Sequence, residues 1–216
     1  MQTVLLDLDG TLIDSAPLIT EHLSRALATV GRDAAPESLR PLVGAPLETA
    51  LPALGLDPEQ SRTVLTTYRA SYDRVAPTNT TLFPGVRRLL EQLGHLRLAV
   101  ATSKREPIAR ELVRRVGIAD RLALTGGADQ AVGRIGKAAV VGSVLERLSL
   151  DPARTPVVMV GDRHHDVEGA AAHGVPTIGV RWGYGSADEL AGARAVVEDA
   201  DALVDALADG RYWSTS

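Results

Sequence analysis

Apolar and polar positions follow two different rhythms along this chain. The first apolar run, residues 4–8, has the length and composition of a short strand that is buried on both faces. Two carboxylates, Asp7 and Asp9, mark the end of that run, and Gly10 follows them directly. We therefore predict a buried strand that ends in acidic side chains. At this point an ordinary Asp-Gly turn remains the alternative interpretation.

Residues 15–83 have helical periodicity throughout. Helical segments are predicted over residues 16–30, 36–42, 47–51 and 58–75. The first of these ends at Gly31, and Asp57 followed by Pro58 is typical of the capped start of the last. These residues are therefore predicted to form an inserted, all-helical domain.

From residue 84 onward, short apolar runs alternate with amphipathic stretches. Strands are predicted over residues 96–101, 122–124, 157–160, 177–180 and, at an edge, 195–197. Helices are predicted over residues 86–93, 107–116, 137–148 and 167–173, with a last helix through Leu203 and Leu207 before a frayed tail. This alternation is typical of an α/β fold with a Rossmann-like parallel sheet flanked by helices. We expect residues 1–14 and 84–216 to form this core domain and residues 15–83 to form a helical cap domain.

Composition and charge narrow the class of protein. The 216 residues are 45% hydrophobic and 23% charged, which is typical of a soluble domain with a sizeable core. The net charge of −4 is not the excess of positive charge expected of a protein that binds a nucleic acid polymer or a membrane surface. Because cysteine is absent, disulfides, thiolate metal sites and a Cys nucleophile are excluded, which suits a cytoplasmic protein. We expect a mature protein that begins at Met1 and exists as a monomer or homodimer.

Chemically capable side chains follow three of the predicted strands and open one helix. They are Asp7 and Asp9, the run Thr102-Ser103-Lys104, Lys137, and the run Asp162 to Asp166. A parallel sheet brings the carboxyl ends of its strands together. The resulting concentration of carboxylates calls for a cation, and carboxylate oxygens are the ligands that Mg²⁺ prefers. The neighbouring His164 and His165 lack the spacing that directs two imidazoles toward one zinc ion.

Each of these residues taken alone has a simpler interpretation. Thr102 and Ser103 can cap the following helix, a role that is compatible with binding phosphate at a helix N-terminus. Lys137 can be a solvated surface residue. Asp162 and Asp166 can be turn and cap residues. The joint pattern favours a site over these readings, whereas Arg163, His164 and His165 are predicted to be loop residues without assigned chemistry.

Four segments together resemble a known family. Asp7-Leu8-Asp9-Gly10-Thr11-Leu12, Ala101-Thr102-Ser103-Lys104, Lys137, and Gly161 to Asp166 are similar, in the expected order, to the four motifs of the haloacid dehalogenase-like hydrolase superfamily. The helical insertion after the first motif is similar to the small cap of the phosphoglycolate phosphatase-like branch. The segment Arg134 to Ala139 lacks the proline that usually follows the lysine in that branch, and with Ile178 to Gly185 it is more similar to 5′-nucleotidase relatives.

The resemblance implies a role for each residue. Asp7 would be the nucleophile that forms an aspartyl-phosphate, and Asp9 the general acid and base. Mg²⁺ would be held by Asp7, by the backbone carbonyl of Asp9 and by Asp162, with Asp166 holding a metal-bound water or Lys137. Lys137 would offset negative charge, Thr102 and the amide of Ser103 would bind a phosphoryl oxygen, and Gly44 would lie near the substrate.

The implied activity is Mg²⁺-dependent hydrolysis of a small phosphorylated metabolite, as in phosphoglycolate phosphatases. A 5′-nucleotidase acting on nucleoside monophosphates and a sugar phosphomutase are the alternatives within the superfamily. A dehalogenase is disfavoured because it needs no acid at the position of Asp9. A signalling receiver domain is disfavoured because it carries its phosphoacceptor on a later strand and lacks an inserted helical domain. An inactive interaction protein would not be expected to keep every reactive position.

Overall fold

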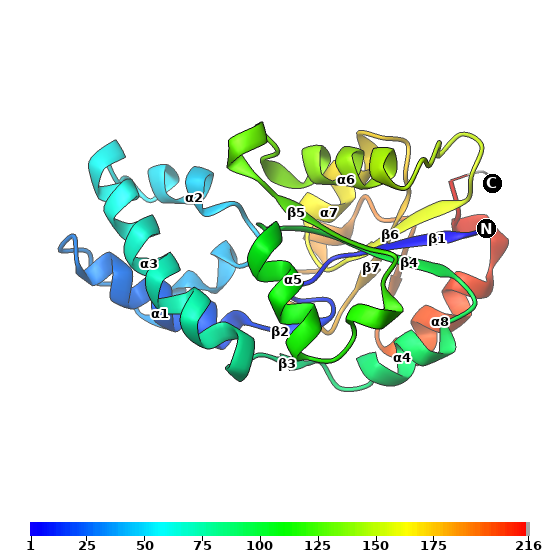
Figure 1. Cartoon of the computed structure of the whole chain (residues 1–216), viewed down its shortest axis with the longest axis horizontal. Helices are drawn as coiled ribbons and strands as arrows, with labels where there is room; N and C mark the ends of the chain where they lie inside the picture. The colour runs from blue at the N-terminus through cyan, green and yellow to red at the C-terminus, as the bar shows by residue number, and fades with distance from the viewer. Residues whose placement is uncertain (215–216) are drawn as a thin grey trace.

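The computed structural model describes residues 1–214, and its centre is a six-stranded parallel sheet (Figure 1). The strands are β1 (Thr3–Leu6), β4 (Arg97–Arg105), β5 (Leu124–Ala128), β6 (Val157–Gly161), β7 (Thr177–Val180) and β8 (Ala195–Val197). Their order is β5-β4-β1-β6-β7-β8, and every neighbouring pair is parallel. From β1 the chain continues to β4, and from β6 it continues in the opposite direction to β7. The point at which the order reverses, where parallel sheets bind ligands, therefore lies between β1 and β6.

Helices cover both faces of the sheet. They are α4 (Val86–Gln92), α5 (Glu106–Arg115), α6 (Gly136–Arg147), α7 (His164–Ala171) and α8 (Ala200–Ala208). Leu5 packs with apolar residues of α6 and α7 on one face, whereas Val4 and Leu6 pack with α4, α5 and α8 on the other (Figure 1). Burial of both faces explains why β1 is apolar without alternation. The predicted α/β fold with a Rossmann-like parallel sheet is confirmed.

The helices of the predicted cap lie together beside the sheet (Figure 1). They are α1 (Ala16–Ala28), a 3₁₀ helix (Pro36–Leu42), α2 (Leu47–Ala53) and α3 (Pro58–Asn79). The carboxylate of Asp57 accepts hydrogen bonds from the amides of Glu59 and Gln60, so α3 begins with the predicted cap. A short antiparallel ribbon of β2 (Ile13–Asp14) and β3 (Thr81–Leu82) joins these helices to the sheet. The boundaries predicted at 15 and 83 lie next to this ribbon, and the division into two domains stays a prediction.

Strand β4 is longer than the sequence predicts. It continues through Thr102 and Ser103 to Arg105, with an irregular register opposite β5. The pairing continues because Gly127 lets the two backbones approach closely: a Cβ on Gly127 would lie 2.6 Å from the carbonyl oxygen of Lys104. Thr102 and Ser103 therefore lie in a strand, and the alternative in which they cap the next helix is wrong. Strand β5 is likewise displaced from the predicted 122–124 to Leu124–Ala128.

Two further predictions about local structure are corrected. Helix α7 begins at His164, so His164 and His165 are helical and not loop residues; a carboxylate oxygen of Asp166 accepts a hydrogen bond from the amide of Arg163 at 3.1 Å and caps this start. The C-terminal segment is packed as far as it is described. Trp213 is only 2% exposed, and its indole N–H donates to the carbonyl of Leu207 at 3.2 Å. The rest of the predicted frayed tail, residues 215–216, lies outside the described residues.

Within residues 1–214, no helix combines the length and the apolar character needed to cross a lipid bilayer.

Candidate active site

Three carboxylates meet at the carboxyl edge of the sheet. Asp7 follows β1, Asp162 follows β6, and Asp166 lies on the first turn of α7. One oxygen from each of them lies within 4.8 Å of the others, and all three side chains are buried. These residues, the acidic cluster from here on, come together because β1 and β6 are neighbours at the point where the strand order reverses.

The backbone packs so closely against the acidic cluster that Gly10 and Gly161 have no room for a side chain. Gly10 has φ +87°, and a Cβ there would lie 2.3 Å from a carboxylate oxygen of Asp162. A Cβ on Gly161 would lie 2.2 Å from the carboxyl carbon of Asp166. Side chains at these positions would displace the carboxylates, so the glycines of the first and last segments have a steric role as well as a conformational one.

Lys137 is the cation that pairs with the acidic cluster. It lies at the start of α6, and its ammonium is 2.5 Å from an oxygen of Asp7, 2.7 Å from an oxygen of Asp166 and 2.9 Å from the carbonyl of Ala101. The residue is buried, which works against its charge, but the two carboxylates outweigh this and raise its pKa. Lys137 is therefore charged at neutral pH and is not a solvated surface residue.

The acidic cluster nonetheless carries more negative charge than Lys137 neutralises. Burial raises the pKa of Asp7 to about 8, against the lowering effect of Lys137 and with a further increase from Asp166 and Asp162. Burial and then the charge of Asp166 raise the pKa of Asp162 to about 7. A bound divalent cation would favour the ionised form of both side chains.

Asp9 faces different surroundings from Asp7. One oxygen of Asp9 accepts a hydrogen bond from the hydroxyl of Ser15 and lies 3.2 Å from the ammonium of Lys104. Lys104 also donates to the hydroxyl of Tyr72 on α3 at 3.0 Å. Burial works against the charge of Lys104, but Asp9 raises its pKa overall. Asp7 therefore belongs to the acidic cluster. Asp9 instead faces Ser15 and Lys104, on the side of the helices of residues 16–79, which are called the helical segment from here on.

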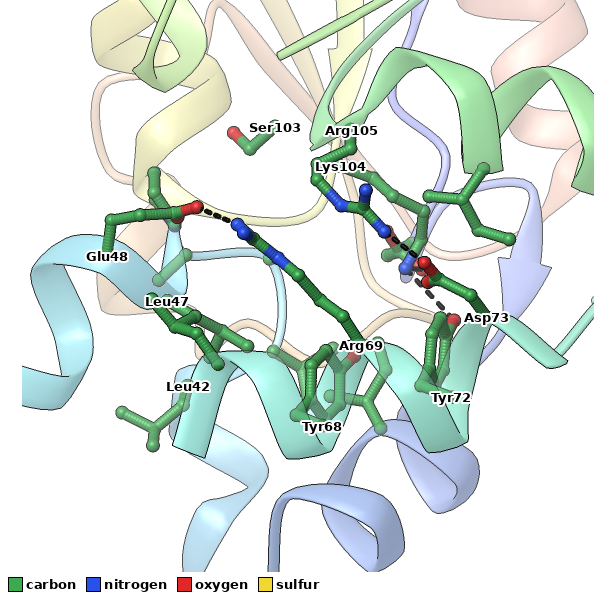
Figure 2. Close-up of a pocket in the computed structure, with 18 residues that line it drawn as sticks. Leu42, Leu47, Glu48, Tyr68, Arg69, Tyr72, Asp73, Ser103, Lys104 and Arg105 are labelled. Carbon is green, nitrogen blue, oxygen red and sulfur yellow. Dashed lines mark hydrogen bonds and ion pairs between the residues drawn. The ribbon is translucent and has the colours of Figure 1, made fainter. Parts of the chain in front are cut away.

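A cavity of about 80 Å³ adjoins Asp9, between β4 and the helices of residues 16–79 (Figure 2). Gly44 and Ser103, both predicted substrate-binding residues, line it. The hydroxyl of Ser103 is buried and has no hydrogen-bond partner among the described residues, which leaves it available to a ligand. The hydroxyl of Thr102 instead accepts a hydrogen bond from the amide of Lys104 at 3.2 Å, within the irregular part of β4.

The cations of the cavity are all paired. Figure 2 shows Arg69 directed at Glu48 and Arg105 directed at Asp73, each as an ion pair. The remaining wall is largely apolar and aromatic; it includes Leu42, Leu47, Leu65, Tyr68 and Tyr72. The cavity thus offers a small, partly apolar space with guanidinium groups at its border, directly beside Asp9.

Sequence reasoning missed two residues near Asp162, namely Arg163, which follows it in the chain, and Tyr184, which contacts it. Arg163, predicted to be a loop residue without chemistry, is 6% exposed and donates to the backbone carbonyls of Pro41 and Val43. The amide of Tyr184 donates to Asp162 at 2.7 Å, and its hydroxyl accepts from the amides of Ser15 and Ala16. The only signal in the sequence for Arg163 is its place directly after Asp162. Tyr184 lies in the segment Ile178 to Gly185, which resembles 5′-nucleotidase relatives, but nothing there indicates its contact with Asp162.

Comparisons with known proteins agree with one another on the family. Residues 4–180 match the family model described as haloacid dehalogenase-like hydrolase. The chain is 41% identical over 209 residues to the tyrosine-protein kinase PtkA of Mycobacterium tuberculosis, which covers 95% of this chain and 71% of that protein. It is 34% identical to a 5′-nucleotidase of Pseudomonas aeruginosa (87% and 86% covered) and 32% identical to a phosphoglycolate phosphatase of Pectobacterium atrosepticum (94% and 88% covered).

Among solved structures, a predicted phosphatase from Clostridium acetobutylicum superimposes with a TM-score of 0.90 at 30% identity, covering 96% of this chain and 98% of that one. The similarity extends over both the sheet and the helices of residues 16–79, because the match spans nearly the whole of each chain.

Proposed function

The chain belongs to the haloacid dehalogenase-like hydrolase family and is a phosphatase; we propose that it acts with Mg²⁺, through an aspartyl-phosphate, on a small phosphorylated metabolite. The observation that carries this proposal is the juxtaposition of Asp7 with Lys137 and two further buried carboxylates at the switch point of the sheet. Hydrolysis of a phosphate monoester needs a positioned nucleophile and neutralisation of the phosphoryl oxygens, and these residues supply both.

The donor set of the acidic cluster suits Mg²⁺. The ligands are carboxylate oxygens with neither thiolate nor imidazole among them, and the ionised cluster exceeds the charge of Lys137. Asp7, Asp162 and the backbone carbonyl of Asp9 would hold the ion, with Asp166 behind them. When bound, Mg²⁺ offsets the charge of the nucleophile and of the phosphoryl oxygens.

Asp7, Asp9 and Lys137 have different roles in the proposed reaction. A carboxylate oxygen of Asp7 attacks phosphorus, and the bond to the leaving oxygen breaks as Asp9 donates a proton to it. The resulting aspartyl-phosphate is hydrolysed by water, from which Asp9 takes a proton, so that phosphate leaves and both aspartates are restored. Lys137 stays beside Asp7 throughout and orients its carboxylate. The contacts of Asp9 with Ser15 and Lys104 hold it on the side of the leaving group.

The cavity beside Asp9 supports a small leaving group. Its volume of about 80 Å³ is far below the roughly 300–1,000 Å³ of typical pockets for drug-sized ligands. A leaving group of two or three carbons, such as glycolate, suits this volume. A nucleoside needs the surrounding helices to move apart. The 34% identity to a 5′-nucleotidase nevertheless keeps that activity as the second candidate.

Phosphate release from a substrate panel tests the proposal. The panel holds 2-phosphoglycolate, nucleoside monophosphates, a sugar phosphate and pyrophosphate, each with Mg²⁺ and with EDTA, and the Asp7→Asn variant is the blank. Release from 2-phosphoglycolate that EDTA abolishes and Mg²⁺ restores supports the proposed function; preference for nucleotides would select the second candidate. Transfer to a second sugar position would identify a mutase. Because a relative is named as a tyrosine kinase, labelled ATP with a tyrosine peptide completes the panel.

A further inference from the structure

Arg163 connects the loop of Asp162 to the helical segment above it. It directly follows Asp162 and precedes α7, yet its guanidinium donates to the carbonyl oxygens of Val43 and, at 3.0 Å, Pro41. The whole residue is 6% exposed. Burying an arginine costs free energy unless its N–H donors are hydrogen-bonded. The contacts with Val43 and Pro41 give partners to both terminal nitrogens of Arg163.

The side chain is also anchored on the side of the sheet. Its Nε donates to a carboxylate oxygen of Glu189 at 2.6 Å, and the same oxygen lies 2.7 Å from the imidazole of His164. The rigid, planar fork of the guanidinium then directs the two terminal nitrogens toward Pro41 and Val43. A lysine has a single nitrogen and cannot contact Glu189 and both carbonyls at once with this geometry.

Of the two residues whose carbonyls Arg163 binds, Val43 belongs to the wall of the cavity, and Pro41 lies two residues before it in the chain. Val43 and Gly44 line it next to Asp9, and Val43 is 1% exposed. Gly44 has φ +90°, and a Cβ built there would lie 3.6 Å from the Cγ of Arg163. The segment Pro41–Gly44, called the wall segment from here on, therefore rests directly on Arg163, which does not itself line the cavity.

We infer that Arg163 is a positioning residue that holds the wall segment over Asp9 and so completes the surface that binds the leaving group. The inference rests on the proposed function for its kinetic consequence, but the contact itself does not. Arg163 touches neither Asp7 nor the cavity space, so its loss removes a surface that ground state and transition state share. Such a loss raises KM more than it lowers kcat.

Two measurements test the inference in the full chain with Mg²⁺. The first is hydrogen exchange of the amides of residues 42–45 in the wild type, Arg163→Met and Arg163→Lys. The second is the separation of KM from kcat on the best substrate of the panel. The matched control is Arg88→Met, since the side chain of Arg88 is 69% exposed and lies on α4, away from the wall segment.

We expect faster exchange of residues 42–45 in Arg163→Met, a KM increase of about tenfold with a smaller change in kcat, and partial rescue by Arg163→Lys. Arg88→Met should match the wild type in both. Unchanged exchange, or a loss of kcat at constant KM together with uniformly faster exchange, would overturn the inference in favour of a general structural role. If the wild type releases no phosphate, the proposed function fails, while the exchange of residues 42–45 still decides whether Arg163 holds the wall segment.

Discussion

In the absence of metal, the wild type is expected to lose stability relative to the Asp7→Asn variant as the pH rises. Asp7→Asn removes one carboxylate from the acidic cluster and keeps the shape of the side chain. Turnover should be lost, because an amide does not form the aspartyl-phosphate. The stability effect follows from the raised pKa of Asp7, which goes from 3.8 to about 8 mainly because the group is buried.

The sign and size of the effect follow from proton linkage. A carboxyl whose pKa is raised on folding contributes stability that is fully present below its unfolded pKa and is lost as the pH rises to its folded pKa. For Asp7 this loss runs from about pH 4 to about pH 8 and amounts to about 1.4 kcal/mol per pH unit. Between about pH 5 and about pH 7 the wild type should therefore lose about 3 kcal/mol relative to Asp7→Asn. The attraction of Lys137 for ionised Asp7 is already among the causes that set this pKa, so the change of stability with pH is the diagnostic quantity.

Urea unfolding in EDTA measures this difference, with the fluorescence of Trp182 and Trp213 as the signal. The exposed Asp33 provides a matched control, since Asp33→Asn makes the same chemical change outside the site. If the free energy of unfolding of the wild type does not fall relative to that of Asp7→Asn between about pH 5 and about pH 7, the electrostatic reasoning is refuted. Added Mg²⁺ should stabilise the wild type more than the variant at about pH 7, because the ion binds the folded acidic cluster.

Three other substitutions have defined outcomes. Gly10→Ala places a Cβ 2.3 Å from Asp162 and requires φ +87°, so we expect Mg²⁺ affinity, measured by titrating activity, to fall at least about tenfold; an unchanged affinity would contradict the steric role of Gly10. Lys104→Met removes the cation beside Asp9 and should lower kcat about tenfold in steady-state assays, whereas wild-type kcat would remove Lys104 from the site. Trp213→Ala empties a buried position and should cost about 3–5 kcal/mol in urea unfolding; a loss below about 1 kcal/mol would indicate that the C-terminal segment is not packed.

Much of the fold follows from local patterns. The apolar strands β1, β6 and β7 and the helices with one apolar stripe lie close to their predicted positions, because burial of a face imposes a period that the sequence must carry. The boundaries that fail have specific causes. Strand β4 extends beyond its apolar run because Gly127 on β5 permits close pairing of the two strands. Helix α7 begins before its predicted first residue because Asp166 caps it by accepting a hydrogen bond from the amide of Arg163. The first cause lies in a neighbouring strand, whereas the second is a local cap inside α7, which the sequence indicated only as an alternative role of Asp166.

The sequence by itself determined the acidic cluster and Lys137. Their residue types follow the ends of predicted strands or open a predicted helix, and a parallel sheet necessarily gathers such positions at one edge. Only the tertiary structure decided how the helical segment meets that edge. The contacts of Arg163 with Val43, of Lys104 with Tyr72 and of Tyr184 with Ser15 join residues far apart in the chain. Such pairs depend on how long, flexible side chains lie once the helices have packed, and no local period in the sequence records that choice.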